Sequence, residues 1–448
     1  MKTLNRIKSK KKFKITFDGQ PDNALSVIPT PNEVGLSPVN YKFIKAKVIV
    51  KVGDAVQKGQ ALFFDKKNPQ VYFHSPVSGV VKDIVYGPQR RLEQVVISEC
   101  SDEKALQFQA FDSSNATQLQ VVSALLERGL FNEFRSRPFN NIPSPEEKPS
   151  SIIVQLSNPE PFHARLSAVI DDVEADIIEG LQLLNKLTEK VIAFADANEQ
   201  MNLDAIATHS QLVRVDGDFS ICDSASVLYK LKEDAAENNA WTCDWQSLVK
   251  IARTLKSNEY YNQRYIAVGG NQKDDNQHYQ IVEGTPVANI ITKKESSDRL
   301  IFGGLFSGVH TSHNDYVPLQ SDSINIIDSD PQAEFMSFLQ PGFDKPSFTT
   351  AYFSGFLNQF RPTPVSTSVN GSERDCVSCG HCEAVCPVDT LPQTMLRNIK
   401  GNDVEEAMRF GLLDCSNCGV CTYVCPSKID LSSIFADAKA KLFEEVNA

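Results

Sequence analysis

The chain has 448 residues, with 45 basic and 56 acidic side chains and a formal net charge of −11. This length supports about three or four domains. The acidic balance argues against nucleic acid as a main partner, because a phosphate backbone repels a negatively charged protein. No run of about 18 apolar residues occurs, so we do not expect the chain to cross a membrane.

The first 24 residues are predicted to form a basic arm. Seven lysine or arginine side chains precede the first acidic residue, Asp18. No apolar segment of about 7–15 residues follows them, so the arm is not a secretory signal. A frayed, solvated arm is the simpler interpretation, and contact with an acidic partner or an anionic membrane surface is the alternative.

Residues 25–105 are expected to form a barrel-sandwich hybrid, the all-β fold of lipoyl and biotinyl domains. Short alternating runs are separated by turns at Gly53 and Gly59, and this stretch resembles the lipoyl-domain signature G-D-x-V-x-x-G-Q-x-L. In those domains a lysine at a hairpin tip is modified. Counting back from Gly79 puts Asn68 at that position, so we expect no lipoyl or biotinyl group and a docking role instead.

Residues 106–258 are predicted to form an open parallel α/β sheet. Apolar runs at 151–156 and 191–195 indicate buried strands, and apolar residues at helical spacing from Val173 to Leu187 lie between them. Strand, helix and strand in this order predict a βαβ unit.

Residues 259–360 carry further apolar runs and are predicted to form a small α+β unit. The segment 361–372 is rich in proline, serine and threonine, which is typical of a linker. It separates the upstream units from residues 373–448.

Two matched cysteine runs occupy that last segment. Each follows the pattern Cys-x-x-Cys-x-x-Cys-x-x-x-Cys-Pro, and together they contain Cys376, Cys379, Cys382, Cys386, Cys415, Cys418, Cys421 and Cys425. Three evenly spaced thiolates can turn inward from a short loop onto three corners of an iron–sulfur cube. The fourth cysteine points away and, in two-cluster ferredoxins, completes the other cube.

The pattern therefore predicts two [4Fe–4S] clusters with crossed ligation. The first cluster is assigned to Cys376, Cys379, Cys382 and Cys425. The second is assigned to Cys415, Cys418, Cys421 and Cys386.

Zinc sites and free thiols are the alternatives. Zinc prefers paired Cys-x-x-Cys units around one tetrahedral ion, so two runs of evenly spaced cysteines fit it poorly. The other three cysteines, Cys100, Cys222 and Cys243, are scattered and are interpreted as buried thiols. Oxygen-sensitive clusters and unpaired thiols indicate a reducing cytoplasm.

The stretch between the two runs is predicted to be helical. Leu391, Met395 and Leu396 share one helical face, and Gly401 is expected to end that helix in the left-handed conformation. The sequence 402–405 has the spacing of a capping box for a second helix. A helical ferredoxin module fits these features.

Taken in order, the units resemble those of one family. Its members combine a lipoyl-like sandwich, a Rossmann-like unit, a β-grasp-like (SLBB) unit and a helical ferredoxin domain in a multidomain α/β and α+β chain. They include the C subunit of the Rnf complex and the A subunit (NqrA) of the sodium-translocating NADH:quinone reductase. The sequence segments 64–69, 129–139 and 389–396 are similar to those of the A subunit.

The resemblance implies a peripheral electron-transfer subunit of an enzyme that oxidises NADH and reduces ubiquinone while exporting Na⁺. Its partners would be the integral-membrane and flavoprotein subunits of the same complex, with a quinone as a further candidate. It would lie at the cytoplasmic face of the bacterial inner membrane, held there through those subunits. We assign no catalytic residue, because the sequence contains no recognisable nucleophile–base–acid set.

Two departures from the family pattern matter. Rnf C subunits carry a glycine-rich phosphate loop before the Rossmann-like unit, whereas Gly129 is the one glycine between 126 and 138. We therefore do not expect FMN, or NADH oxidation by this chain alone. Arg128, Arg135 and Arg137 could bind an anion, with a surface helix and turn as the simpler interpretation.

Conversely, many NqrA proteins have degenerate cysteine runs, and both runs are intact here. Two alternatives therefore stay open. One is an Rnf-type C subunit that passes electrons between NADH and ferredoxin. The other is an assembly scaffold with structural clusters.

Overall fold

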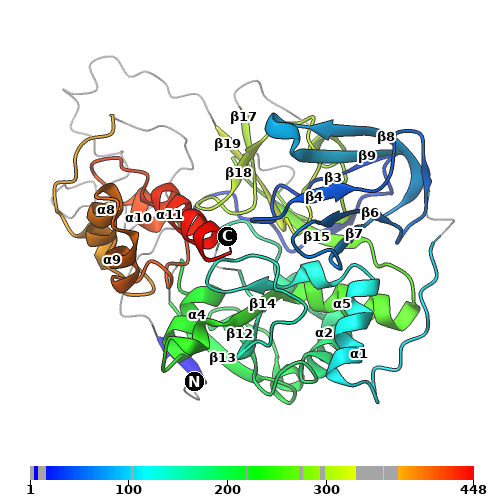
Figure 1. Ribbon diagram of the computed structural model, residues 1–448, viewed down its shortest axis with the longest axis horizontal. Coiled ribbons are helices and arrows are strands. Elements are labelled where there is room, and N and C mark those ends of the chain that lie inside the picture. The colour runs from blue at the N-terminus through cyan, green and yellow to red at the C-terminus, as the bar shows by residue number, and fades with distance from the viewer. Residues whose placement is uncertain are drawn as a thin grey trace.

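The computed structural model describes residues 5–8, 17–101, 105–158, 160–217, 219–271, 276–292, 298–328, 357 and 372–447. These residues form a β-rich unit, an α/β unit, a mixed-sheet unit and a C-terminal helical unit, which lies to one side of the others (Figure 1). Almost all of the predicted linker 361–372 falls outside the described residues, as do most of 329–360 and half of the predicted basic arm.

The β-rich unit consists of two small antiparallel sheets. One has the order β3 (Glu33–Leu36), β9 (Leu92–Ser101), β8 (Ser78–Tyr86) and β5 (Ala55–Val56), with a 3-10 turn η1 (Pro88–Arg90); the other has the order β4 (Ala46–Val48), β6 (Ala61–Asp65) and β7 (Tyr72–His74). The rings of Phe63 and Phe73 stack in its core with centroids 4.7 Å apart.

The predicted turns of this unit are confirmed. Gly53 and Gly59 have φ angles of +91° and +84°, which glycine adopts without steric cost. Asn68 lies in the hairpin turn between β6 and β7, where its carbonyl accepts the Val71 N–H at 2.9 Å.

The α/β unit is built on a six-stranded sheet. Its order is β1 (Arg6–Lys8), β13 (Gln211–Asp216), β12 (Val191–Asp196), β11 (Ser151–Gln155), β14 (Ala240–Asp244) and β10 (Arg135–Ser136). Pairing is parallel from β1 to β14, and β10 is antiparallel. The predicted βαβ unit is confirmed, because β11 and β12 pair in parallel and are joined by α2 (Ile170–Leu184).

The other helices of this unit pack around that sheet. They are α1 (Gln118–Glu127), α3 (Asp204–Ala207), α4 (Ser224–Leu231) and α5 (Trp245–Ser257), with 3-10 turns η2 (Phe131–Glu133), η3 (Leu166–Ala168) and η4 (Ala236–Asn238). Helix α5 begins where the Asp244 carboxylate accepts the Ser247 N–H at 2.7 Å, and it ends at Asn258 in the left-handed conformation.

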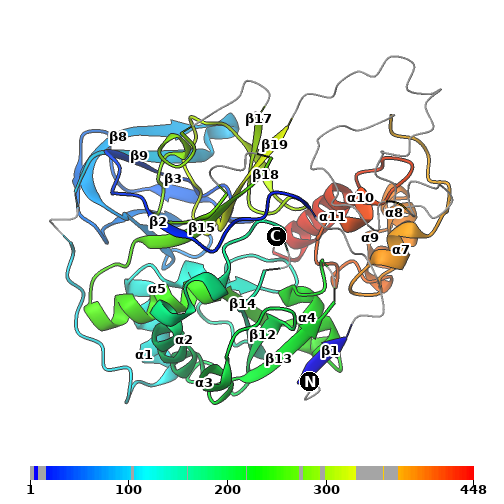
Figure 2. The same cartoon turned by 180° about the vertical axis from the view of Figure 1, so that it is seen from behind.

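Strand β1 departs from the sequence interpretation of a frayed arm. Arg6, Ile7 and Lys8 pair with β13 at the edge of the α/β sheet (Figure 2), and Arg6 forms an ion pair of 2.7 Å with Asp216. Ile7 is buried, so the sheet gains an apolar side chain as well as ladder hydrogen bonds. This part of the arm is therefore a strand of the distant α/β unit.

The mixed-sheet unit has the order β18 (Val309–Thr311), β17 (Asp298–Phe302), β19 (Ser323–Asp328), β15 (Gln263–Gly270), β16 (His278–Val282) and β2 (Leu25–Val27), with a 3-10 turn η5 (Val287–Asn289). Strands β15 and β19 pair in parallel, as do β16 and β2. Strand β2 falls within the range expected for the barrel-sandwich hybrid but belongs to this sheet, so the chain enters the β-rich unit only after it.

The described residues of the C-terminal unit form helices joined by loops, with no strand among them. Its helices are α7 (His381–Val385), α8 (Pro392–Lys400), α9 (Val404–Arg409), α10 (Val420–Tyr423) and α11 (Leu431–Val446). Met395, Leu396, Ala407 and Phe435 are buried at its centre. In the part of the chain that the structure describes, no helix combines the length and apolar character needed to span a bilayer.

The two helices predicted between the cysteine runs are confirmed as α8 and α9, but their boundary is shifted by one residue. Gly401 has φ −83°, and Asn402 adopts the left-handed conformation with φ +58°. Asp403 then caps α9 by accepting the Glu406 N–H at 2.9 Å. Asparagine tolerates this conformation, because its short polar side chain hydrogen-bonds locally.

Candidate functional site

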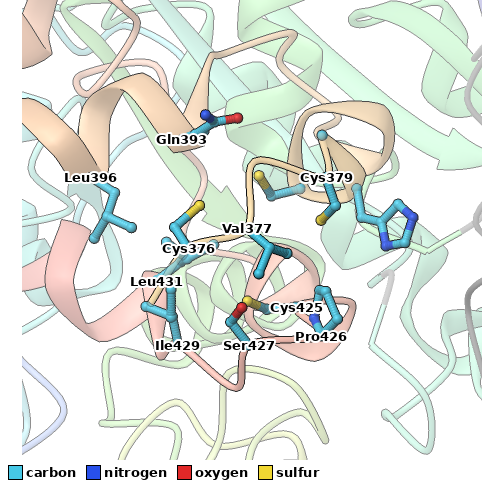
Figure 3. Close-up of a pocket in the computed structure, with 13 residues that line it drawn as sticks. Cys376, Val377, Cys379, Gln393, Leu396, Cys425, Pro426, Ser427, Ile429 and Leu431 are labelled. Atoms are coloured by element: carbon cyan, nitrogen blue, oxygen red, sulfur yellow. The ribbon is translucent and has the colours of Figure 1, made fainter. Parts of the chain in front are cut away.

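Four cysteines from both runs line one hollow in the helical unit. They are Cys376, Cys379, Cys382 and Cys425, and the hollow is partly open to solvent. Figure 3 shows Cys376 and Cys379 on one segment and Cys425 beside Pro426 on another, all around this hollow. Leu396, Ile429 and Leu431 supply apolar walls.

The other four cysteines line a second hollow of nearly equal size. They are Cys386 from the first run and Cys415, Cys418 and Cys421 from the second. Each hollow thus receives three cysteines from one run and the last cysteine of the other. This is the grouping that the cysteine spacing predicted.

The two cysteine loops share a backbone conformation that positions their sulfurs. Ser378 and Gly380, on either side of Cys379, have φ angles of +56° and +74°. Asn417 and Gly419, on either side of Cys418, have φ angles of +59° and +75°. Residues in the left-handed backbone conformation turn each loop inward just before helix α7 or α10 begins.

The Ser/Asn-Cys-Gly pattern that produces this curl is a signal that the interpretation of the sequence missed. Gly419 is needed for space as well as for φ, because a Cβ there would lie 2.5 Å from the Phe306 carbonyl oxygen. A Cβ at Gly380 would meet nothing within 4 Å, so that glycine serves the backbone conformation alone.

The donor set of both hollows fits a metal cluster. Burial raises the pKa of Cys382 to about 11 and that of Cys418 to about 12, so these thiols keep their protons unless a cation replaces them. Among the residues that the structure describes, no three His, Cys, Asp or Glu side chains gather closely enough to hold one metal ion. A [4Fe–4S] cube is wider than a single metal ion. It can therefore bind sulfur atoms that lie further apart than the roughly 3.8 Å between two sulfur ligands of one tetrahedral zinc ion.

Polar groups also contact the cysteines of the second hollow. The Cys386 sulfur and the Thr390 hydroxyl oxygen lie 3.0 Å apart, and the Asn417 N–H donates to the Cys415 sulfur at 3.4 Å. Hydrogen bonds to cluster sulfurs shift the reduction potential of a cluster.

Known protein families match three parts of the chain. Residues 7–99 match the NqrA N-terminal barrel-sandwich hybrid domain, residues 116–260 match the NqrA second alpha/beta domain, and residues 368–433 match a 4Fe-4S dicluster domain. The A subunit of the Na(+)-translocating NADH-quinone reductase of Neisseria meningitidis serogroup B is 31% identical over 417 residues, which cover 91% of this chain and 92% of that protein.

The chain belongs to the NqrA family, the A subunits of Na⁺-translocating NADH-quinone reductases. The NqrA proteins of Tolumonas auensis and Photorhabdus laumondii are 28% and 29% identical, over 90% and 91% of this chain and 91% and 92% of those proteins. A chain of the NAD⁺-reducing [NiFe]-hydrogenase in its H₂-reduced state overlaps 75% of this chain and 62% of its own length, with 11% identity and a TM-score of 0.38, which is only a distant likeness.

The domain matches confirm two predictions for this member of the NqrA family. The N-terminal unit is a barrel-sandwich hybrid domain, and the C-terminal unit is an iron–sulfur domain of the 4Fe-4S dicluster kind, in place of the zinc alternative.

The helical unit docks against the rest of the protein through ion pairs and rings. Lys230 pairs with Asp389 at 2.5 Å, and Lys232 pairs with Asp414. The ring of Phe443 stacks on that of Phe43 with centroids 4.0 Å apart.

The glycine-poor segment before the α/β sheet is buried, so the expected surface helix and turn is wrong. Arg128 donates to the carbonyls of Ala124 and Gln109, and Arg135 donates to the carbonyls of Asn132 and Phe134. Gly129, with φ +63°, packs against His74 so closely that a Cβ would lie 2.8 Å from its ring. Both arginines are therefore engaged in internal hydrogen bonds.

A buried carboxyl lies where the α/β unit meets the loop that touches the cluster domain. Glu160 accepts the Ser307 hydroxyl at 2.7 Å and the Phe306 N–H at 3.2 Å. Phe306 in turn contacts the ring of Tyr423, with centroids 5.4 Å apart. Burial raises the pKa of Glu160 to about 7.

Replacing Glu160 with glutamine should therefore stabilise the protein at alkaline pH. A carboxyl whose pKa is raised on folding stabilises the fold fully below its unfolded pKa, and this contribution is lost as pH rises through the folded pKa. From about pH 5 to about pH 8, the wild type should lose about 2.5 kcal/mol relative to the variant. Thermal unfolding of both proteins across this range measures the difference. The exposed Glu189→Gln is the control, and equal pH profiles for Glu160→Gln and wild type would contradict the prediction.

Proposed function

We propose that this protein relays electrons through two [4Fe–4S] clusters in a Na⁺-translocating NADH:quinone oxidoreductase. The observation that carries the proposal is the sorting of eight cysteines into two hollows of nearly equal size, with four in each. A cluster of this kind accepts and releases one electron at a time. The chain's own residues hold it, exclude water around it and set its potential.

The ligation that we propose is crossed. Cys376, Cys379, Cys382 and Cys425 hold the first cluster. Cys386, Cys415, Cys418 and Cys421 hold the second. The lining of the two hollows supports this assignment over one cluster per run, because each run contributes its last cysteine to the other hollow.

The finer domain assignments are also proposals. The order β13-β12-β11-β14 corresponds to the 3-2-1-4 order of a doubly wound sheet, which supports a Rossmann-like unit. The mixed sheet with parallel β15 and β19 at its centre supports a β-grasp-like unit. The proposed domain boundaries are 25–105, 106–258, 259–360 and 373–448. In addition, strand β1 belongs to the sheet of the second unit, and strand β2 belongs to the sheet of the third.

The partners follow from the relatives' names and the family resemblance. The protein assembles with integral-membrane and flavoprotein subunits, at the cytoplasmic face of the membrane, and a quinone is the final electron acceptor of the complex. The barrel-sandwich hybrid domain serves as a docking module without a lipoyl or biotinyl group, since Asn68 is at the hairpin tip.

The isolated protein should not oxidise NADH. A nicotinamide or flavin phosphate needs converging backbone N–H groups, and in the segment before β10 the side chains of Leu130, Phe131 and Phe134 fill the space. With reconstituted clusters under anaerobic conditions, the absorbance near 400 nm should persist with NADH, bleach with dithionite and return when a quinone is added.

This titration also tests the Rnf-type alternative, which the two intact cysteine runs favour. Rapid bleaching by NADH, or a stoichiometric FMN in the purified chain, would contradict our proposal and support a C subunit that exchanges electrons between NADH and ferredoxin.

A further inference from the structure

A pocket of about 270 Å³ lies where three units of the chain meet. The β-rich unit contributes Lys42 and Phe43, the α/β unit contributes Arg137 and Phe139, and helix α11 of the cluster domain contributes Lys439. The pocket also touches Ser416 and Asn417, which follow Cys415 in the second cysteine run.

The charged groups of this pocket are strongly unbalanced. Lys42, Arg91, Arg137 and Lys439 line it, against a single lining carboxylate, that of exposed Asp437, while Asp223 and Asp414 act on Arg137 from outside the lining. Lys439 is 6% exposed and donates to the Cys415 carbonyl and, at 3.2 Å, to the Asn417 side-chain oxygen. Both acceptors are neutral, so its charge has no counter-ion in those bonds.

Arg137 lacks the internal partners that its neighbours have. Arg128 and Arg135 use their guanidinium groups on backbone carbonyls, whereas the buried Nε–H of Arg137 has no acceptor among the described residues. An unpaired buried donor destabilises the free protein, so a ligand that accepts this hydrogen bond binds more tightly.

The cations also oppose one another. Lys42, Arg137 and Lys439 line the same pocket, so their positive charges repel one another. An anion bound between these groups would relieve the desolvation and the repulsion together.

We propose that this pocket binds a small phosphomonoester, with the dianionic phosphate held by Lys42, Arg137 and Lys439 and the organic part beside Phe43 and Phe139. A guanidinium can donate two hydrogen bonds to one phosphate, which favours phosphate over a halide or a single carboxylate. The pocket volume leaves room for an organic group next to the phosphate, and the aromatic rings provide an apolar wall for it.

Calorimetric titration of the full-length protein with both clusters loaded tests the proposal. The probes are phenyl phosphate, inorganic phosphate and, as a neutral analogue, benzyl alcohol. We expect saturable binding of phenyl phosphate that is tighter than that of inorganic phosphate, and no binding of benzyl alcohol. Arg137→Gln and Lys42→Met should each weaken phenyl phosphate binding about tenfold or more.

The matched control is Lys441→Met, which removes an exposed cation from the same helix as Lys439 and should leave the affinity unchanged. Cluster spectra and thermal unfolding midpoints establish that each variant is folded. If Arg137→Gln does not fold, Lys42→Met still tests the proposal, because Lys42 lies at the exposed rim of the pocket. Absence of saturable binding by loaded wild type would overturn the proposal and leave the cations as counter-charges for the neighbouring cluster. Binding that is equally strong in Arg137→Gln and Lys42→Met would also overturn it.

Discussion

Replacing Cys386 with alanine should remove one cluster and leave the other intact. Cys386 belongs to the first run in sequence, but it is buried in the second hollow beside Cys415, Cys418 and Cys421. A [4Fe–4S] cluster that loses one of its four thiolate ligands loses iron readily. The cluster in the first hollow keeps all four of its cysteine ligands. Iron analysis of anaerobically purified protein should fall from about eight to about four atoms per chain.

Double variants identify which cluster is lost. Cys386→Ala combined with Cys418→Ala should keep about four iron atoms, because both changes affect the same cluster. Cys386→Ala combined with Cys379→Ala should keep almost none. Cys100→Ala, outside both hollows, is the control. The reverse outcome for the two double variants would show that each run holds its own cluster.

Replacing Lys250 with methionine should destabilise the fold strongly. The ammonium group lies 2.9 Å from Glu133 and 2.6 Å from Glu283, and these three side chains are 4%, 1% and 2% exposed. Glu133 follows α1, Lys250 is on α5 and Glu283 follows β16, so this ion network joins the α/β unit to the mixed sheet. Removing the cation leaves two buried carboxylates near each other with Arg264 as their remaining positive neighbour, at a cost of about 3–5 kcal/mol.

The pH dependence of this effect has a defined sign. Although burial alone would raise it, Lys250 and Arg264 lower the pKa of Glu133 to about 2 in the wild type. Without Lys250 the carboxylates bind protons more readily, so the variant should recover part of its stability as pH falls. Chemical denaturation at neutral and mildly acidic pH measures this.

The matched control for that experiment is Lys256→Met, an exposed lysine on the same helix, which should cost less than about 0.5 kcal/mol. Equal effects of Lys250→Met and Lys256→Met would show that the buried network contributes nothing specific.

Local patterns in the sequence predicted the features that depend on local structure. The cysteine spacing predicted which residues gather, because three cysteines two residues apart must share a loop. The apolar runs around 151–195 predicted β11, α2 and β12, since each is long and strongly periodic. The turns at Gly53 and Gly59 followed from the same kind of signal.

Pairings between distant segments could not be predicted in this way. Strand β1 has only three residues and joins β13 some 200 residues later, and β2 joins β16 in the same manner. A polar, basic stretch such as Arg6–Lys8 carries no local strand signal, and its partner strand decides its conformation. The internal hydrogen bonds of Arg128 and Arg135 were missed for a related reason, because a sequence does not show which backbone carbonyls will accept them.

Freeze-quench EPR of the intact complex during turnover tests most directly whether this protein relays electrons. When NADH is added anaerobically, the signals of both [4Fe–4S] clusters should appear no more slowly than the complex turns over, and a quinone should then abolish them at a similar rate. Clusters that stay oxidised with NADH in the complex, yet are reduced by dithionite, would contradict the relay and identify them as structural.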